Sequence, residues 1–330
     1  MPRVIKFDRA GGPEVLRFVE EEVRAPGRSE VRIKVKAIGV NRAESMWRQD
    51  DYIEPVSSFP AVLGYEAAGV VDAVGPDVTD VAVGDEVNVM PAFSQNDYGT
   101  YGEVAVVPLH AVVKHPKSLS HAEAASVWMM FVTAYGALIA DAKVGKGDFV
   151  LIPAASSSVG LAAIQLANYA GATPIAVTRT TAKKQQLLEA GAAHVIVSDE
   201  EDLVEAVMRI TGNKGVDVAF DPIGGPDFPK LIAALKFNGT VFIYGALAEG
   251  VTPLPVLAMI AKMPIIKGYS IWSTSGDPAR SKAAVEYVLK GFEVGALKPV
   301  IDRVFTFDEM VEVHRYLESN GQFGKIVVTV

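Results

Sequence analysis

The sequence contains no cysteine. This absence excludes disulfides, thiol catalysis, iron–sulfur clusters and every zinc site that depends on thiolate ligands. Dense basic runs are also missing, and 39 Asp and Glu residues against 31 Lys and Arg give a formal charge of −8 at pH 7. Nucleic acid and anionic membrane surfaces are therefore poor partners for this chain.

Long apolar runs are scarce as well. No run approaches the roughly 18 residues that are needed to cross a bilayer, and residues 1–8 carry charges where a signal peptide would be apolar. We therefore expect a cytoplasmic protein with no membrane partner. The chain has 330 residues, of which 50% are hydrophobic and 21% charged, and this is enough for two folded domains.

The first third of the chain has the alternating pattern of strands with one buried face. Residues 31–38 alternate apolar and basic side chains. Further short strands are expected at 70–74, 86–89 and 103–107, where Gly, Pro and Asp mark the turns between them. This pattern predicts a mainly antiparallel, barrel-like domain.

Beyond residue 120, runs of apolar residues rich in Val and Ile alternate with segments of helical period. The runs occupy residues 149–154, 174–178, 195–198, 216–220, 240–244 and 265–268. Parallel strands that are buried on both faces have such continuous apolar runs, and the helices between them form right-handed crossovers. We therefore predict an α/β fold with a doubly wound parallel sheet of the Rossmann type.

Two amphipathic helices and a closing strand follow residue 271. The second helix begins at a capping box, Thr306-x-x-Glu309, and residues 325–330 have the pattern of a strand. This last strand has the character of the N-terminal domain. We therefore expect a discontinuous first domain, residues 1–125 and 271–330, around a dinucleotide-binding domain of residues 126–270.

The turn after the run 149–154 has the sequence context of a pyrophosphate site. Ser157, Ser158, Val159 and Gly160 lie where this run leads into a helix. Backbone amides and the dipole at a helix N-terminus can hold phosphate oxygens without a charged side chain. Serines stand where glycines are usual, so an ordinary strand-to-helix turn is the alternative interpretation.

The next strand ends at Thr178 and Arg179, where an NAD enzyme usually has a carboxylate for the ribose 2′-hydroxyl. Lys183 and Lys184 open the following helix, and paired cations oppose the helix dipole unless an anion lies between them. A 2′-phosphate is such an anion, so we predict NADPH as the cofactor. A solvated basic turn is the alternative.

Several short motifs along the chain are informative jointly. They are Gly11-Gly-Pro-Glu-Val-Leu16, Gly39-Val-Asn41, Leu63-Gly-Tyr-Glu-Ala-Ala-Gly-Val-Val-Asp-Ala-Val-Gly75, Val83-Gly-Asp-Glu-Val87, Thr133-Ala-Tyr-Gly136 and Gly324-Lys-Ile-Val-Val328. In these motifs the chain resembles the medium-chain dehydrogenase/reductase superfamily, and within it the zinc-independent, zeta-crystallin-like quinone oxidoreductase group. The resemblance implies a GroES-like, mainly antiparallel β-barrel catalytic domain beside the Rossmann domain.

The resemblance also locates the positions at which metal-dependent relatives hold catalytic zinc. Here these positions are Asn41, Tyr65 and Met129, and none is a zinc ligand of the required type, so no metal is expected. Without a metal to stabilise an alkoxide, saturated alcohols are poor substrates. Quinones and conjugated enones accept hydride into a delocalised anion, so the expected substrate is a small molecule of one of these classes.

Two residues are candidates for steadying that anion. The resemblance places Asn41 near the nicotinamide, where its amide could donate to an oxyanion; an Asn that caps a turn is the alternative. Tyr52 matches a tyrosine of the quinone and enoyl reductase branches, and its phenol could donate a hydrogen bond or a proton. The ring could instead cover an apolar loop before Pro55.

Other positions follow from the resemblance alone. Glu44 stands where related reductases often have Asp, and Glu66 is expected in a buried structural pair. Further cofactor contacts are expected from Thr133, Pro222, Gly245 and Ala246. An apolar substrate slot would be lined by residues that could equally be core, namely Trp47, Tyr65, Phe93, Met129 and Trp272.

These observations favour an NADPH-dependent reductase of quinones or activated double bonds. An enoyl-thioester reductase and a non-catalytic NADPH-binding protein are the alternatives. The resemblance implies a homodimer that pairs through residues 265–270, with a tetramer as the alternative. The five histidines have no ligand spacing and are expected to be structural or solvated.

Overall fold

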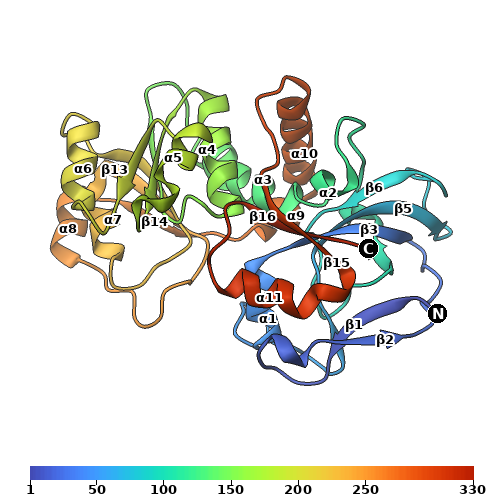
Figure 1. The fold of residues 1–330 in the computed structure, drawn as a ribbon. Helices are drawn as coiled ribbons and strands as arrows, with labels where there is room; N and C mark the ends of the chain where they lie inside the picture. Colours follow the sequence, from blue (N-terminus) through green and yellow to red (C-terminus); the bar gives the residue numbers. More distant parts are fainter. The chain divides into compact units, whose positions relative to one another are not determined.

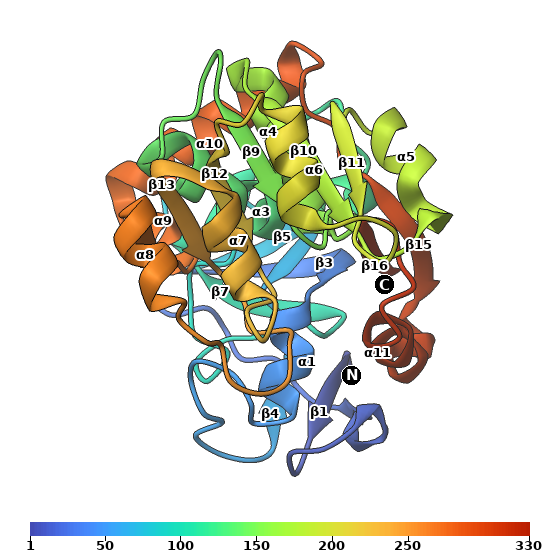
Figure 2. The same cartoon turned by 90° about the vertical axis from the view of Figure 1, so that its left-hand side faces the viewer.

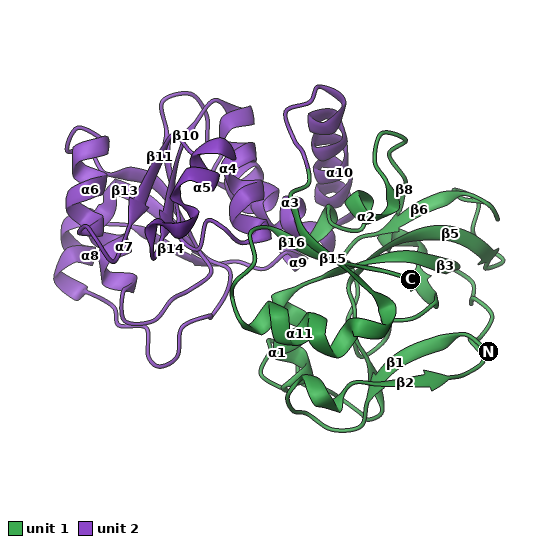
Figure 3. Ribbon diagram, in the orientation of Figure 1, with its two compact units in different colours: residues 1–129, 299–330 green, residues 130–298 purple.

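The chain divides into two compact units in the computed structural model, which describes residues 1–330. Unit 1 comprises Met1–Met129 and Pro299–Val330, and unit 2 comprises Met130–Lys298 (Figure 3). The helices and strands of both units are labelled in Figure 1. Unit 1 is thus discontinuous, because the end of the chain returns to it.

Unit 1 contains two β-sheets. The smaller has the strand order β2-β1-β4, and the larger has the order β15-β16-β3-β5-β6-β8, with β7 also paired to β3. The strands are β1 (Arg3–Phe7), β2 (Arg17–Glu20), β3 (Glu30–Val40), β4 (Ala61–Val62), β5 (Glu66–Val74), β6 (Glu86–Val89), β7 (Val104–Pro108), β8 (Val112–Lys114), β15 (Ile301–Thr306) and β16 (Lys325–Thr329).

The larger sheet confirms the expected mainly antiparallel domain. All its pairs are antiparallel except β15 with β16. The final strand joins it as predicted, because Ile326 pairs with Val40 and Val328 with Ile38. The sheet does not close into the predicted barrel, since β8 and β15 remain its edge strands.

Helices are few in unit 1. They are α1 (Arg42–Arg48), α2 (His121–Ala124), α11 (Met310–Glu318) and the short 3-10 turns η1 (Pro13–Val15), η2 (Leu109–Ala111) and η5 (Phe307–Glu309). The predicted capping box is present, since the Thr306 backbone N–H donates to Glu309 Oε2 at 2.8 Å. Helix α3 (Trp128–Ala134) carries the chain from unit 1 into unit 2.

Unit 2 contains one six-stranded sheet with the order β11-β10-β9-β12-β13-β14. All neighbouring strands are parallel. This is the strand order of a doubly wound Rossmann sheet, and it confirms the prediction. The strands are β9 (Phe149–Ile152), β10 (Thr173–Thr178), β11 (His194–Val197), β12 (Val216–Asp221), β13 (Leu235–Ile243) and β14 (Ile265–Gly268).

Helices cover this sheet and account for its apolar runs. Leu151, Ile175 and Val241 of the sheet are buried in one core cluster with Val207 of α6 and Leu231 of α7. Figure 2 shows α6 and α7 lying across the strands. The helical segments of unit 2 are the π-helix η3 (Tyr135–Asp141), α4 (Ser158–Ala170), η4 (Thr181–Lys183), α5 (Lys184–Glu189), α6 (Leu203–Ile210), α7 (Phe228–Ala234), α8 (Val256–Lys262), α9 (Trp272–Ser275) and α10 (Pro278–Glu293).

The contacts group residues 271–298 with unit 2, whereas the sequence places a domain boundary at 271. Aromatic contacts on α10 explain this grouping. Phe292 meets Phe131 with ring centroids 5.4 Å apart, and Tyr287 lies 5.1 Å from both Tyr135 and Tyr169. The apolar face of α10, which the sequence shows clearly, therefore packs on unit 2.

One stretch corrects the expectation that no apolar run is long enough to cross a membrane. The 21 residues His121–Asp141 would suffice by length and composition. The stretch comprises α2, α3 and η3, and 78% of its most apolar window is buried inside the structure. The core helix of a soluble protein has these same properties, so the stretch is weak evidence for a membrane span.

Candidate active site

Asn41 lies where strand β3 turns into helix α1, and it is the N-cap of that helix. Its backbone is extended, with φ −130° and ψ 153°. The Asn41 backbone N–H donates to Glu44 Oε2 at 2.7 Å, which is the reciprocal half of a capping box. Asn at the N-cap and Glu three residues later therefore begin α1 at this point.

Glu44 is fully buried, and four hydrogen bonds converge on its carboxylate. Oε1 accepts from Asn41 Nδ2 and from the Tyr65 backbone N–H, both at 3.1 Å. Oε2 accepts from the Asn41 backbone N–H and, at 2.9 Å, from the Tyr101 hydroxyl. Burial raises the pKa of Glu44, while the donors from Asn41 and Tyr65 lower it. Because all four partners are donors, the site fits an ionised carboxylate, which only accepts.

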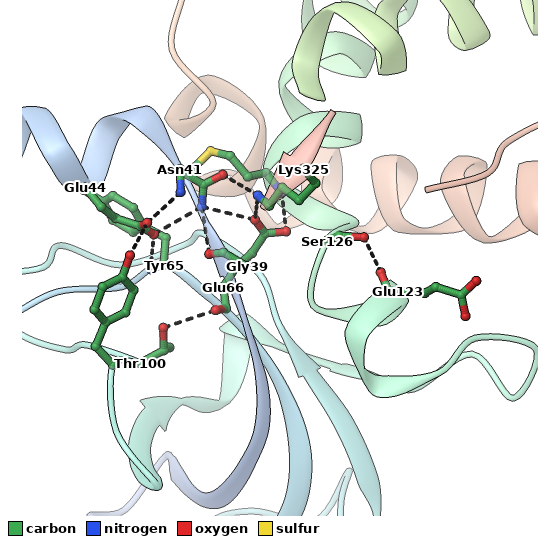
Figure 4. Close-up of polar contacts among 11 residues, drawn as sticks. Gly39, Asn41, Glu44, Tyr65, Glu66, Thr100, Glu123, Ser126 and Lys325 are labelled. Atoms are coloured by element: carbon green, nitrogen blue, oxygen red, sulfur yellow. Dashed lines mark hydrogen bonds and ion pairs between the residues drawn. The ribbon is translucent and has the colours of Figure 1, made fainter. Parts of the chain in front are cut away.

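Glu66 and Lys325 form a fully buried ion pair beside Asn41 (Figure 4). Lys325 Nζ lies 2.6 Å from Glu66 Oε2 and donates to Asn41 Oδ1 at 2.5 Å. The other oxygen of Glu66, Oε1, accepts from the Met129 backbone N–H at 2.9 Å. The buried structural pairing expected for Glu66 is therefore present, and its partner is a lysine from the final strand.

These contacts use both ends of the Asn41 amide. Nδ2 donates toward Glu44 Oε1, Glu66 Oε2 at 3.2 Å and the Gly39 carbonyl at 3.3 Å, while Oδ1 accepts from Lys325. An amide NH₂ has two hydrogens, and three acceptors already surround it. In this arrangement Asn41 offers an incoming ligand its carbonyl oxygen, which has a second lone pair, rather than an N–H.

A second series of buried hydrogen bonds connects Glu44 to helix α11. The Tyr101 hydroxyl donates to Glu44, and His314 Nε2 lies 3.2 Å from the same hydroxyl. Tyr101 therefore accepts from His314, which assigns the proton of the neutral imidazole to Nε2. Burial lowers the pKa of His314 to about 3. His314 is thus a structural histidine, as the sequence suggests.

Tyr52 lies in the loop between α1 and β4, which neighbouring side chains tie down. Asn96 Oδ1 accepts from the Ser57 backbone N–H at 2.7 Å, and Asn96 Nδ2 donates to the Pro55 carbonyl at 3.0 Å. The Ser94 hydroxyl donates to Glu54 at 2.9 Å. Burial raises the pKa of Tyr52 to about 12, so the phenol keeps its proton at neutral pH and can donate a hydrogen bond or act as an acid, but not as a base.

The predicted slot residues are distributed over both units. Trp47 is buried against Phe7, with ring centroids 5.6 Å apart, and Tyr65 faces Phe93 at 6.1 Å. A cavity of about 400 Å³ in unit 1 is lined by Trp47 but by none of Tyr65, Phe93 and Met129. Met129 is half-buried, and Trp272 belongs to unit 2. Burial also raises the pKa of Tyr65.

A zinc ion does not fit the side chains at the three positions where metal-dependent relatives hold it. The amide of Asn41, the phenol of Tyr65 and the thioether of Met129 are not among the thiolate, imidazole and carboxylate ligands that usually bind zinc. The nearby carboxylates are already paired with Lys325 and with backbone and side-chain donors. No group of three His, Asp or Glu side chains anywhere in the chain could hold a metal ion.

In unit 2, the turn between β9 and α4 has the geometry of a phosphate site. Ser157 is the N-cap of α4, and its hydroxyl accepts from the Gly160 backbone N–H at 3.0 Å. A Cβ at Gly160 would lie 2.6 Å from the Ala155 carbonyl oxygen, so only glycine allows the helix to approach the turn that precedes it this closely. The first turn of this 13-residue helix also contains Ser158 and Val159, and its amides can bind a pyrophosphate.

The basic residues predicted to bind the 2′-phosphate lie beside that turn. Lys183 Nζ is 3.4 Å from the Ser156 hydroxyl, which brings the loop after β10 next to the loop after β9. Thr178 ends β10, and Arg179 follows it with its side chain exposed. The structure therefore brings the predicted pyrophosphate and 2′-phosphate residues together.

The carboxyl ends of β12 and β13 are joined at Pro222 and Gly245. A Cβ at Gly245 would lie 2.5 Å from the Pro222 carbonyl oxygen. Ala246 follows with its side chain exposed, while Thr133 is buried in α3. The buried carboxylate of Asp221, which the sequence did not indicate, orders this edge by accepting from the Ile223 and Gly224 backbone N–H groups at 2.9 and 3.0 Å. Burial raises the pKa of Asp221.

Sequence reasoning missed three members of the unit 1 cluster as site residues. Tyr101 has no motif around it, and His314 is one apolar-face position of an amphipathic helix. Lys325 alone had a signal, because a lysine in an otherwise apolar closing strand must find a buried partner.

Known protein families match most of unit 1 and most of unit 2. Residues 27–117 match the alcohol dehydrogenase GroES-like domain, and residues 158–289 match the zinc-binding dehydrogenase family. Quinone oxidoreductase of Homo sapiens is 30% identical over 329 residues, which cover 99% of this chain and 97% of the relative. A 2-haloacrylate reductase of Burkholderia sp. is 30% identical over 326 residues, which cover 97% of this chain and 96% of the relative. The crystal structure of Escherichia coli quinone oxidoreductase complexed with NADPH has a TM-score of 0.90 and 28% identity, and the match covers 99% of this chain and all of that one.

Proposed function

Because the chain belongs to the zeta-crystallin-like quinone oxidoreductase group of the medium-chain dehydrogenase/reductase superfamily, we propose that it is an NADPH-dependent reductase of quinones and activated double bonds. The observation that carries the proposal is the buried cluster of Asn41, Glu66 and Lys325, in which Asn41 occupies a position where a metal-dependent relative would have a zinc ligand. Relatives named for quinones and for a 2-haloacrylate, a conjugated double bond, support the acceptor class.

Unit 2 is the NADPH-binding part of the enzyme. The amides of the first turn of α4 would hold the pyrophosphate, and Lys183 with Arg179 would pair with the 2′-phosphate. NADPH supplies a hydride when bound. A neighbour of 28% identity is crystallised with NADPH, which supports this assignment.

The reduction needs a proton as well as a hydride. A quinone becomes a hydroquinone, and a conjugated double bond becomes a single bond, by gaining both. Tyr52 is our candidate for the donor, because its phenol keeps its proton at neutral pH and its loop is held by Asn96 and Ser94. A metal is not needed, since the acceptor itself delocalises the charge.

The acceptor class can be tested by NADPH oxidation with purified, chelator-treated protein. We expect turnover with a quinone or a conjugated enone, no turnover with a saturated aldehyde, and lower kcat/KM with NADH than with NADPH. Preference for an enoyl thioester would favour the enoyl reductase alternative. Tight NADPH binding without turnover on any acceptor would favour a non-catalytic protein, and turnover on the aldehyde alone would contradict the proposal.

Replacing Tyr52 with Phe is expected to lower kcat/KM on the enone by at least about tenfold and to affect the quinone less. The enone carbon must receive a proton, whereas a reduced quinone can take one from water. Tyr98→Phe is the matched control, because Tyr98 donates to Glu30 at 2.9 Å in the same unit. Unchanged turnover of Tyr52→Phe on both acceptors would reduce Tyr52 to a packing role.

We also propose that the protein is a cytoplasmic homodimer formed through unit 2. Strand β14 is an edge strand, and helix α8 beside it has no buried residue. Leu257 is 83% exposed and Ile260 69%. Such an apolar face is rare on a monomer, and pairing two copies of an edge strand would cover it. The other exposed apolar side chains in this part of the chain are Leu247, Val251, Leu254, Val256, Met263 and Ile265.

The double variant Leu257→Asp with Ile260→Asp is expected to convert a dimer of twice 35.1 kDa into a monomer. Two carboxylates in the centre of an apolar interface would remain unpaired and desolvated. Sedimentation or light scattering measures the mass. Leu188→Asp, on α5, is the control and should remain dimeric. A wild-type protein of monomeric mass, or a variant of unchanged mass, would contradict the assignment, and a fourfold mass would support a tetramer.

A further inference from the structure

Lys325 is the only cation within hydrogen-bond distance of a cluster that holds two buried carboxylates. Its side chain is 0% exposed, and so is that of Glu66. An isolated buried charge is costly, so the ammonium and the carboxylates must be kept together. Lys325 also acts on Glu44 at longer range and favours its ionised form.

The backbone around Lys325 is shaped to admit its side chain. A Cβ at Gly39 would lie 3.0 Å from Lys325 Cε and 1.9 Å from the Ala125 carbonyl oxygen. Strand β16 pairs with β3 at this point, Ile326 with Val40. The aliphatic part of the Lys325 side chain thus lies against Gly39, and its ammonium group contacts Asn41 and Glu66 (Figure 4).

The amide of Asn41 could in principle face either way, because its two ends have the same shape. Its surroundings decide the matter: one cation lies on the Oδ1 side, and two carboxylates and a carbonyl lie on the Nδ2 side. A flipped amide would point its NH₂ at an ammonium and its oxygen at carboxylates. Lys325 donates to Oδ1, and the acceptors around Nδ2 favour the same orientation.

We propose that Lys325 is a positioning residue whose ammonium fixes the orientation of the Asn41 amide and so makes Asn41 a hydrogen-bond acceptor, not a donor, at the reductase site. The catalytic consequence rests on the proposed function. Asn41 would receive a hydroxyl or an amide N–H, such as those of a ribose or a carboxamide. The developing oxyanion would then have to find its donor elsewhere, as at Tyr52.

The orientation can be measured without any activity. In protein labelled with ¹⁵N-asparagine, the Asn41 side-chain NH₂ signals are assigned by their loss in Asn41→Leu. We expect slow hydrogen exchange of these signals in the wild type, because both hydrogens are bonded to buried acceptors. We expect fast exchange and a changed shift in Lys325→Met. The matched control is Lys6→Met, because Lys6 is paired with Glu21 at 2.6 Å in the same unit. Unchanged Asn41 signals in Lys325→Met would overturn the proposal.

Kinetic measurements then distinguish a positioning role of Lys325 from a role in stability alone. Lys325→Met should lower kcat at saturating NADPH and quinone by about 100-fold, the effect of a small misplacement at a reacting centre. The double variant Lys325→Met with Glu66→Gln leaves no unpaired charge of this pair. The double variant should be thermally more stable than Lys325→Met, while its kcat stays well below that of the wild type. It also provides a folded protein for the measurement if Lys325→Met unfolds. Recovery of kcat together with stability would show a purely structural pair and overturn the proposal. A different outcome would be that the wild type has no turnover while the Asn41 signals still change in Lys325→Met. This outcome would count against the proposed function and leave the positioning role of Lys325 intact.

Discussion

Replacing Glu44 with alanine is expected to destabilise unit 1 by about 3–5 kcal/mol. The substitution leaves three donors without an acceptor, namely the backbone N–H groups of Asn41 and Tyr65 and the Tyr101 hydroxyl, and it removes one of the acceptors of Asn41 Nδ2. It also leaves a cavity that the surrounding strands cannot fill. Urea unfolding followed by circular dichroism measures the change in the free energy of unfolding.

Two further variants show whether the cause is the lost acceptor. Glu44→Gln keeps the shape but turns one of the two oxygens into a donor, so about half of the loss is expected. Glu14→Ala is the control, because Glu14 is an exposed carboxylate paired with Arg315, and the loss of such a surface pair should change the free energy of unfolding little. A loss below about 1 kcal/mol in Glu44→Ala would contradict the hydrogen-bonded burial described for this residue.

The second large effect is a loss of stability at low pH, which we expect from His314. The pKa of His314 is lowered from 6.5 to about 3 in the folded protein. At a pH between these two pKa values, His314 is protonated in the unfolded chain but neutral in the folded chain. The free energy of unfolding therefore falls as the pH falls from about 6.5 to about 3. Linkage gives a contribution of about 1.4 kcal/mol per pH unit over this window, with none above it.

His314→Gln removes the titrating group and keeps an N–H that can reach the Tyr101 hydroxyl. The slope of the free energy of unfolding against pH should therefore be smaller in this variant by about 1.4 kcal/mol per unit between pH 4 and 6. His194→Gln, at an exposed position of β11, should keep the wild-type slope. If His314→Gln and the wild type have equal slopes, the buried neutral imidazole is not the source of acid sensitivity.

Periodic features of the sequence predicted the fold well. The six apolar runs of the second half correspond to β9 through β14, and Ile265–Gly268 and Glu86–Val89 match their predicted bounds. The runs of β9, β10 and β12 are easiest to recognise, because strands buried on both faces have few polar positions. The small sheet of β1, β2 and β4 gave no comparable signal. The larger sheet of unit 1 remains open between β8 and β15, and whether edge strands pair leaves no local pattern in a sequence.

The candidate site was predictable only in its local parts. Asn41 with Glu44 could be expected as a capping pair, and the β9–α4 turn as a phosphate site, since each lies within a few residues. Asn41 and Lys325 are 284 positions apart, so no spacing rule connects them. The role expected for the Asn41 amide depended on this distant cation, and only the three-dimensional contacts reveal that its N–H groups are already used.

The position of Lys325 on the final strand has a consequence for biosynthesis. The ribosome releases all of unit 2, residues 130–298, before β16 emerges. Until then Glu66 lacks its counterion and β3 lacks its partner strand at Val40 and Ile38. The nascent unit 1 therefore cannot close its charged centre. Vectorial synthesis would thus complete the charged centre of unit 1 last, after every residue of unit 2 has been synthesised.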